Sequence, residues 1–348
     1  MSEPEILFER HGRLGLVTLN RPRALNTLTL AMVRAIDGQL KAWARDPAIA
    51  AVAIRGAGGR AFCAGGDIRD LYQLGVAGRY AEALTFWREE YALNTLIKEY
   101  PKPYVALIEG IVMGGGVGVS VHGSQRVAIG DIAFAMPEVG IGFFPDVGAT
   151  YFLPRLPPGV GIWLALTGRQ LGAADAFTLG IVTHCVAPRG GDGAVAMLAG
   201  AAPVDDALAR LSVDPGPAPI APHLPAIARL FAGDGVEAIL AALDAETGPA
   251  AGLAREAAAA IRTKSPSSLT IAFEQVRRGA GLDFREAMRT EYRIVSRRVR
   301  HPDLYEGIRA VVIDKDNAPR WRPATLAEVA AGDAAAYFAP LAEELELA

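Results

Sequence analysis

Two acidic side chains in apolar surroundings are the residues of this sequence best suited to carry out chemistry. Glu138 follows Met136-Pro137, and Asp146 follows Phe143-Phe144-Pro145. Burial of a carboxyl group among apolar side chains raises its pKa, and acids of this kind are frequent in active sites. The pattern therefore predicts acid–base or nucleophilic roles for Glu138 and Asp146.

Two glycine-rich loops could supply backbone donors for the same chemistry. Gly114-Gly115-Gly116 lies between the apolar stretch 104–108, an expected strand, and the apolar run 117–121, an expected helix. N–H groups at the start of a helix point outward and carry partial positive charge. A second loop, residues 56–67, contains Gly65-Gly66 and also follows an expected strand. Two such loops on one sheet could place two donors on one oxygen, as acyl chemistry requires.

Each of these features also has a plain structural interpretation. A glycine-rich turn often serves packing alone, and a Glu after Pro is commonly a helix cap or a surface group. Cys63 beside Phe62 is typical of a small buried residue, because no obvious His or acid partner for catalysis lies near it in sequence. Glu89 and Glu90 fall within an expected helix, where an acid pair usually forms a solvated face.

Composition limits the classes of protein to which the chain can belong. Its 348 residues are 51% hydrophobic and 21% charged, enough for a sizeable core and too apolar for disorder. A net charge of −3 argues against a nucleic-acid partner. The two cysteines, Cys63 and Cys185, have no metal-type spacing and form no disulfide framework. The N-terminus is acidic and no apolar run is long enough for a membrane span. We therefore expect a soluble cytoplasmic protein without a membrane partner.

Apolar periodicity predicts the elements that position these groups. The first half is expected to contain two strands within residues 5–20, a helix capped by Asn26 or Thr27 and ended by Asp46-Pro47, a strand over 49–55, a helix from Asp67 and a helix over 81–100. The second half is expected to contain helices over 161–167 and from 173, a strand over 181–186, a loosely packed linker over 190–225, and helices over 235–243, 249–262, 267–279 and 284–300.

The C-terminal region is expected to form a separate part of the chain. We predict a core of residues 1–200 that carries the site, followed by a linker and helical region, residues 201–348, packed on it. Ser265-Pro266-Ser267 is a good helix start. Arg297, Arg298 and Arg300 form a basic cluster, interpreted as a solvated face with phosphate contact as the alternative.

Three of the motifs resemble those of the crotonase (enoyl-CoA hydratase/isomerase) superfamily. They are AFCAGGDI at 61–68, GGGVG at 114–118 and FAMPEVGIG at 134–142. The resemblance implies an α/β fold, a spiral of ββα repeats followed by a helical C-terminal region. FPDVG at 144–148 and IDKDNAPRW at 313–321 are similar to the hydrolase branch of this superfamily. The match covers almost the whole chain apart from residues around 190–260.

The resemblance also implies roles for individual residues. The N–H groups of Gly66 and Gly115 correspond to an oxyanion hole, Glu138 to the principal carboxylate and Asp146 to its partner at the acyl group. Glu90 lines the substrate site, together with Gly115, Glu138 and Asp146. The loops that contact CoA contain Arg23, Ala24, Cys63, Ala64, Gly65 and Asp67. No separate cofactor is implied, because CoA is part of the substrate.

One departure from the hydratase pattern is informative. Hydratases of this superfamily use two glutamates, and the first would stand at the position of Gly118. The resemblance therefore favours hydrolysis of 3-hydroxyisobutyryl-CoA to 3-hydroxyisobutyrate and CoA, a step of valine breakdown. A hydratase or isomerase acting on a short acyl-CoA, and a CoA-binding protein without turnover, are the alternatives. Whether Glu138 attacks the carbonyl or activates water stays open, and a homo-oligomer is one option because relatives form trimers.

Overall fold

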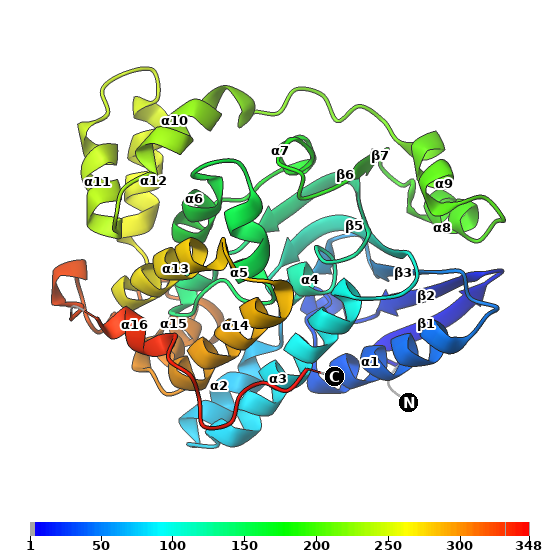
Figure 1. Ribbon diagram of the computed structural model, residues 1–348, viewed down its shortest axis with the longest axis horizontal. Helices are drawn as coiled ribbons and strands as arrows, with labels where there is room; N and C mark the ends of the chain where they lie inside the picture. The colour runs from blue at the N-terminus through cyan, green and yellow to red at the C-terminus, as the bar shows by residue number, and fades with distance from the viewer. Residues whose placement is uncertain (1–3, 331, 348) are drawn as a thin grey trace. The chain divides into compact units, whose positions relative to one another are not determined.

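A seven-stranded sheet carries both glycine-rich loops (Figure 1). The computed structural model describes residues 4–330 and 332–347. The strands follow the order β1-β2-β3-β5-β6-β7, with β4 paired to β5. Only the β1–β2 pair is antiparallel among the pairs β1–β2, β2–β3, β3–β5, β4–β5 and β6–β7. The strands are β1 (Ile6–His11), β2 (Leu14–Leu19), β3 (Ala51–Gly56), β4 (Ala61–Cys63), β5 (Tyr104–Met113), β6 (Gln125–Ala135) and β7 (His184–Val186).

Contacts divide the chain into two compact units, each assembled from three separate segments. The first unit runs up to Asp67 and adds Ala92–Phe134 and Gln170–Pro219. The second contains Ile68–Tyr91, Ala135–Arg169 and the chain from Ile220 onward. The division between residues 200 and 201 stays a prediction.

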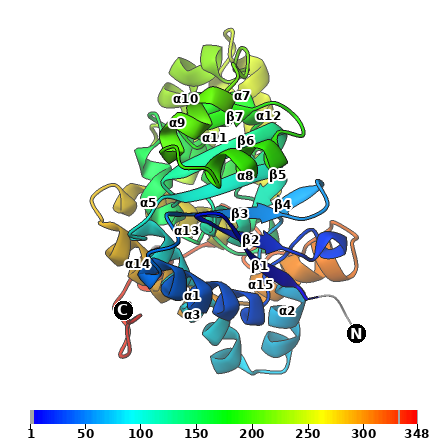
Figure 2. The same cartoon turned by 90° about the vertical axis from the view of Figure 1, so that its right-hand side faces the viewer.

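The sheet of the first unit is covered by helices, which accounts for its apolar strands. Every residue of β2 is buried, as expected for a strand with both faces covered. These strands are labelled in Figure 2. Leu16 of β2, Ala53 of β3 and Val105 of β5 belong to one buried core cluster. The helices of this unit are α1 (Leu30–Arg45), α4 (Gly115–Gly118), α7 (Ala173–Thr178), α8 (Gly191–Leu198) and α9 (Val204–Leu211), and α3 (Tyr80–Lys98) runs from the second unit into the first.

The expected linker over residues 190–225 is wrong over its first half. Helices α8 and α9 form there and bury Val195, Leu198 and Leu208 in the cluster with the strands. Spacing of apolar residues by three and four places them on one helix face. Ala194 and Ala207, both fully buried, belong to the same cluster.

Two further local expectations in the first unit are corrected. Thr29, instead of Asn26 or Thr27, caps α1, and its hydroxyl accepts from Met32 N at 3.2 Å. Asn26 has a φ of 57° and its buried amide donates to the Ala57 and Ala61 carbonyls, so it joins loops instead. The helix expected over 117–121 is the single turn α4.

The second unit is mainly helical, as predicted for the C-terminal region. Its helices are α2 (Ile68–Val76), α5 (Ala149–Phe152), α6 (Val160–Thr167), α10 (Leu224–Leu230), α11 (Val236–Ala245), α12 (Ala251–Arg262), α13 (Pro266–Gly279), α14 (Phe284–Arg298), α15 (Pro302–Ile308) and α16 (Asp333–Tyr337). Helix α13 packs on α5, α6 and α16. Its predicted start is confirmed, since the Ser265 hydroxyl accepts from Ser268 N.

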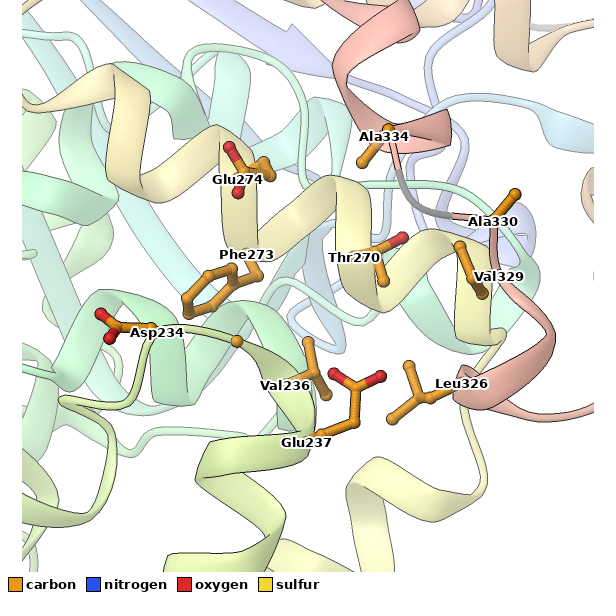
Figure 3. A pocket seen from close by; sticks show the side chains of 12 residues that line it. Asp234, Val236, Glu237, Thr270, Phe273, Glu274, Leu326, Val329, Ala330 and Ala334 are labelled. Carbon is orange, nitrogen blue, oxygen red and sulfur yellow. The ribbon is translucent and has the colours of Figure 1, made fainter.

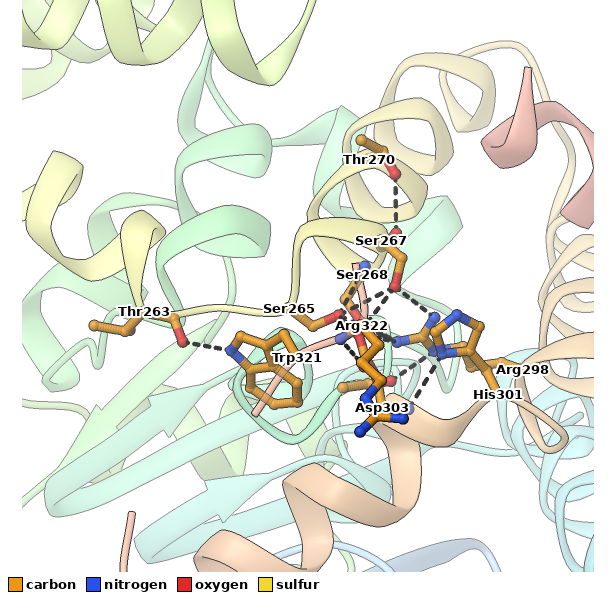
Figure 4. A network of polar contacts seen from close by, with 11 residues as sticks. Thr263, Ser265, Ser267, Ser268, Thr270, Arg298, His301, Asp303, Trp321 and Arg322 are labelled. Atoms are coloured by element: carbon orange, nitrogen blue, oxygen red, sulfur yellow. Dashed lines mark hydrogen bonds and ion pairs between the residues drawn. The ribbon is translucent and has the colours of Figure 1, made fainter. Parts of the chain in front are cut away.

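The solvated-face interpretation is wrong for Arg298. Its side chain is fully buried and donates to the Gly142 carbonyl and to the hydroxyls of Ser265, Ser267 and Ser268 (Figure 4). Asp303 lies 3.8 Å from the guanidinium and accepts from Ser265 at 2.6 Å. Arg298 therefore ties the turn after Glu138 to helices α13 and α15. The cluster of three arginines indicates a solvated face in sequence, and the burial of Arg298 is seen only in the fold.

Candidate active site

The two glycine-rich loops lie beside each other at the ends of neighbouring strands. Strands β4 and β5 are parallel, with Cys63 paired to Val112, so the segments that follow them leave the sheet at the same edge. A Cβ built on Gly116 would lie 2.2 Å from the Cys63 carbonyl oxygen, so only glycine fits this approach. A Cβ built on Gly65 would lie 4.0 Å from Gly115 N. The predicted juxtaposition of the loops is confirmed.

The N–H groups of Gly66 and Gly115 have the character of available donors. Gly115 is the first residue of α4, and an N–H at this place has no acceptor within its helix. Around Gly66, Leu28 N donates to Gly65 O at 2.9 Å and Asp67 N donates to Leu28 O at 2.8 Å. Across the part of the chain that the structure describes, no backbone acceptor is recorded for Gly66 N.

The loops expected to contact CoA are held together by backbone bonds. Ala64 N donates to Leu25 O at 3.0 Å, which joins the 63–67 loop to the segment that contains Arg23 and Ala24. The Asp67 carboxylate pairs with Arg21 at 2.9 Å. Cys63 is fully buried, consistent with the interpretation as a small packed residue. The structure thus brings this predicted set together in the first unit, and its contact with CoA stays a prediction.

Glu138 and Asp146 are both buried in the second unit, as their apolar surroundings predicted. Glu138 begins a short 3₁₀ turn (Glu138–Ile141) and Asp146 lies on the loop that leads into α5. The Tyr91 hydroxyl donates to Oδ2 of Asp146 at 2.9 Å. Oε2 of Glu138 has no hydrogen-bond partner among the described residues, although the residue is only 6% exposed. Burying a carboxylate oxygen without a hydrogen-bond partner costs free energy of folding, so Glu138 is a candidate for a direct contact with substrate.

Two further buried carboxylates belong to the same group. Glu90 is 2% exposed, so the solvated-face interpretation is wrong for it, and within the described chain its Oε1 has no partner. Glu291, from α14, accepts from Gly148 N and Thr150 N, each at 2.8 Å. Glu90, Glu291 and Asp146 therefore influence one another electrostatically across three separate elements.

Burial is the main cause of the raised pKa values in this group. Loss of solvation raises the pKa of Glu138 and of Glu90, and repulsion from Asp146 raises both further. The pKa of Asp146 is raised to about 7 by burial, against the effect of the Tyr91 hydrogen bond. The pKa of Glu291 is raised to about 8 by burial and then by Asp146. Acids with pKa values near neutrality can exchange protons during a reaction.

Three aromatic side chains from the segments that contain these acids pack on one another. Trp87 of α3 stacks on Phe143 with ring centroids 5.6 Å apart, and Phe143 and Phe144 are 4.5 Å apart. All three belong to the segments next to Glu90, Asp146 and Glu138 in sequence. All three are buried, like the acids that follow or precede them in the chain.

Sequence reasoning missed Tyr91 and Glu291. Glu291 could have been found, because it falls on the apolar stripe of α14 with Ala287, Met288 and Val295. A charged residue at a core position of an amphipathic helix is a usable signal.

Three other findings do not concern the predicted site residues. A cavity of about 220 Å³ in the second unit, lined in part by Asp234, Glu237, Thr270 and Phe273, contains none of them (Figure 3). Among the described residues, no group of three or more His, Cys, Asp or Glu side chains is suited to hold a metal ion. None of the helices in the described chain is both long and apolar enough to cross a membrane.

Comparison with known proteins identifies the class to which this fold and site belong. Residues 14–338 match the enoyl-CoA hydratase/isomerase family, so the chain belongs to that family. The α/β crotonase fold expected from the motifs is thereby confirmed. The chain is similar to a 3-hydroxyisobutyryl-CoA hydrolase, mitochondrial, of Danio rerio, with 45% identity over 93% of this chain and 87% of the relative. The Homo sapiens protein of the same name is 43% identical over 97% of this chain and 89% of its own length.

Two solved structures share nearly the whole fold under different names. A carnitinyl-CoA dehydratase from Mycobacterium thermoresistibile has a TM-score of 0.93 and 46% identity, covering 99% of both chains. An enoyl-CoA hydratase from Rhodobacter sphaeroides 2.4.1 has a TM-score of 0.91 and 40% identity, covering 99% of this chain and 100% of that one. The names of these relatives therefore divide between thioester hydrolysis and addition or removal of water.

Proposed function

We propose that this protein hydrolyses 3-hydroxyisobutyryl-CoA to 3-hydroxyisobutyrate and CoA. The observation that carries the proposal is similarity of 41–45% identity, over 93–98% of the chain, to several curated proteins named 3-hydroxyisobutyryl-CoA hydrolase. The chain is an acyl-CoA thioester hydrolase, and the reaction fits a step of valine breakdown. The buried acids Glu138 and Asp146 support this assignment, since a carboxylate can act as the base or the nucleophile of hydrolysis.

In the proposed mechanism, Glu138 is the principal catalytic carboxylate. It either attacks the thioester carbon to form a mixed anhydride that water then cleaves, or removes a proton from the attacking water. In both routes a C–O bond forms, the C–S bond breaks, and the CoA sulfur leaves as thiolate and takes a proton. The N–H groups of Gly66 and Gly115 are assigned to the negative charge that develops on the carbonyl oxygen.

Asp146 and Glu90 are assigned to the acyl group. A carboxylate at Asp146 accepts the hydrogen bond of a 3-hydroxyl and holds the thioester carbon in line with Glu138. The unpaired Oε1 of Glu90 supports a second polar contact to substrate. The loops that contain Arg23, Ala24, Cys63, Ala64, Gly65 and Asp67 are assigned to CoA, mainly through their backbone. CoA is part of the substrate, so no further cofactor is proposed.

The alternative function is addition of water to an enoyl-CoA, the activity in the name of one solved relative. That chemistry uses two glutamates on one water, and the first of those positions is Gly118 here. A glycine cannot accept or donate the proton, so the alternative is the weaker candidate.

Location and assembly are also proposals. A cytoplasmic site is proposed from the free cysteines, whereas the curated hydrolase relatives are named mitochondrial. A homo-oligomer is proposed because relatives in the superfamily form trimers. Elution volume in size-exclusion chromatography with light scattering tests the second proposal.

The test of function is thiol release across short acyl-CoA thioesters, with the acid product identified by mass. We expect rapid release from 3-hydroxyisobutyryl-CoA and slow release from isobutyryl-CoA. Crotonyl-CoA serves as the substrate of the alternative. Loss of its enoyl absorbance without thiol release would replace hydrolysis by hydration.

A further inference from the structure

The turn that carries Asp146 contains a strained residue. Val147 has a φ of 53° and is 1% exposed, and the next residue, Gly148, has a φ of 93°. The left-handed region is unfavourable for a β-branched side chain, whose Cβ substituents crowd the backbone. Such a conformation persists only where the surroundings enforce it. The groups that hold this turn are therefore part of how Asp146 is aimed.

Glu291 holds the turn from the side of α14. One carboxylate oxygen accepts from Gly148 N and the other from Thr150 N, each at 2.8 Å. Both N–H groups follow Asp146 within four residues, and Thr150 is fully buried. A carboxylate that bridges two N–H groups fixes the spacing between them, which a single acceptor cannot do.

Gln275 holds the same turn from the side of α13. Its Nε2 donates to the Pro145 carbonyl at 2.5 Å and to Oγ1 of Thr150 at 2.8 Å. Its Oε1 is buried and has no partner in the described chain. Gln275 thus fixes the residue before Asp146, while Glu291 fixes the residues after it.

We propose that Glu291 and Gln275 are positioning residues that hold the strained 145–150 turn, and thereby set the direction of the Asp146 carboxylate and the preference for a 3-hydroxyacyl group. The proposal rests on the proposed role of Asp146. Neither residue needs to touch the substrate. Burial, and then repulsion from the Asp146 carboxylate, raise the pKa of Glu291 to about 8. An apolar core residue would avoid this repulsion, so geometry of the turn accounts better for a glutamate here.

The test compares Glu291→Gln, Gln275→Leu and the control Glu286→Gln, which removes a carboxylate from the same helix at a half-exposed position. The glutamine at 291 keeps the shape but turns an NH₂ toward one of the two backbone donors. The leucine at 275 removes both donated bonds and leaves the buried Pro145 carbonyl without this donor, which costs about 1–3 kcal/mol in folding. For each protein, kcat/KM is measured with 3-hydroxyisobutyryl-CoA and with isobutyryl-CoA. Hydrogen exchange of peptides covering residues 145–150 is measured without substrate.

We expect both site variants to lower the preference for the hydroxylated thioester by about tenfold and to speed exchange in the turn, with the control unchanged. Partial unfolding alone lowers both kcat/KM values together and leaves their ratio unchanged. If Glu291→Gln does not fold, Gln275→Leu decides the question. A folded variant with the wild-type ratio, or with wild-type exchange in the turn, overturns the proposal. If the wild-type protein releases no thiol, the proposed function is contradicted instead. Hydrogen exchange of residues 145–150 then still shows whether Glu291 and Gln275 hold the turn.

Discussion

The hydroxyl of Tyr91 donates to Oδ2 of Asp146 at 2.9 Å, and both side chains are buried. The two residues are 55 positions apart in sequence and belong to α3 and to the loop before α5. The bond favours the ionised carboxylate and so opposes the effect of burial on the pKa of Asp146, which still reaches about 7. This relationship links the charge of Asp146 to a single removable hydroxyl.

Tyr91→Phe is expected to shift the pH dependence of hydrolysis. If ionised Asp146 is the active form, wild-type kcat/KM rises with pH through about 7, the pKa of this carboxyl. Loss of the hydroxyl removes a bond that lowers this pKa, so the rising limb moves to higher pH. The measurement is kcat/KM from pH 5 to pH 9, a range of about four units around this pKa.

Tyr100→Phe is the matched control for that experiment, because its hydroxyl donates to the Leu40 carbonyl and to no carboxylate. It should leave the profile unchanged. If kcat/KM of folded Tyr91→Phe rises over the same pH range as that of the wild type, the rise belongs to the ionisation of another group.

Asp146→Asn is expected to narrow the preference for 3-hydroxyisobutyryl-CoA over isobutyryl-CoA as well as slow the reaction. A hydrogen bond to a charged group contributes about 1.5–3 kcal/mol, so the ratio of kcat/KM values should fall by roughly tenfold or more. Asn keeps the shape and can still accept from Tyr91. Asp192→Asn, at a highly exposed carboxylate, is the control. An unchanged ratio takes hydroxyl recognition away from Asp146.

Glu138→Gln is expected to lower kcat by about a hundredfold or more, since Gln can act neither as base nor as nucleophile. Gln preserves shape and one acceptor, so melting temperature and CoA affinity should stay near wild type. The control is Glu256→Gln, a surface carboxylate paired with Arg169. The assignment is wrong if the folded variant keeps more than about a tenth of wild-type kcat.

Gly115→Pro is expected to raise the barrier by about 2.7–4 kcal/mol through loss of one oxyanion donor. Gly115 is the first residue of α4, a position at which the proline ring is compatible with helical geometry. Gly115→Ala also adds a Cβ but keeps the N–H, so the difference in kcat between the two variants isolates the donor. Equal kcat in both folded variants would remove Gly115 from the oxyanion hole.

Arg298→Met is expected to destabilise the protein by about 3–5 kcal/mol, because it leaves the buried Asp303 carboxylate without its positively charged partner. The guanidinium donates to the Gly142 carbonyl and to three serine hydroxyls. Chemical denaturation measures the loss. Arg300→Met, an exposed arginine two residues later, should change the free energy of unfolding by less than about 1 kcal/mol. Equal losses would show that the buried network contributes nothing particular.

Local patterns predicted the features that depend on neighbouring residues. The apolar sequence around Glu138 and Asp146 indicated their burial, and the glycines at 65–66 and 114–116 indicated close backbone approach. Strands and most helices followed from apolar periodicity of two or of three to four residues. These signals lie within one element or one turn, where the chain's own geometry brings side chains together.

The tertiary structure decided which distant groups share an environment. Tyr91 reaches Asp146 across 55 residues, and Glu291 reaches Gly148 and Thr150 across 143 and 141. Asn26 could cap a helix by type, but its buried amide joins two loop carbonyls and leaves capping to Thr29. Arg298 and Glu90 look solvated in sequence, yet helix packing buries both. The residue type determines which reactions and hydrogen bonds a side chain can take part in. Its solvation and its partners, and hence its pKa, depend on contacts between segments that are remote in sequence.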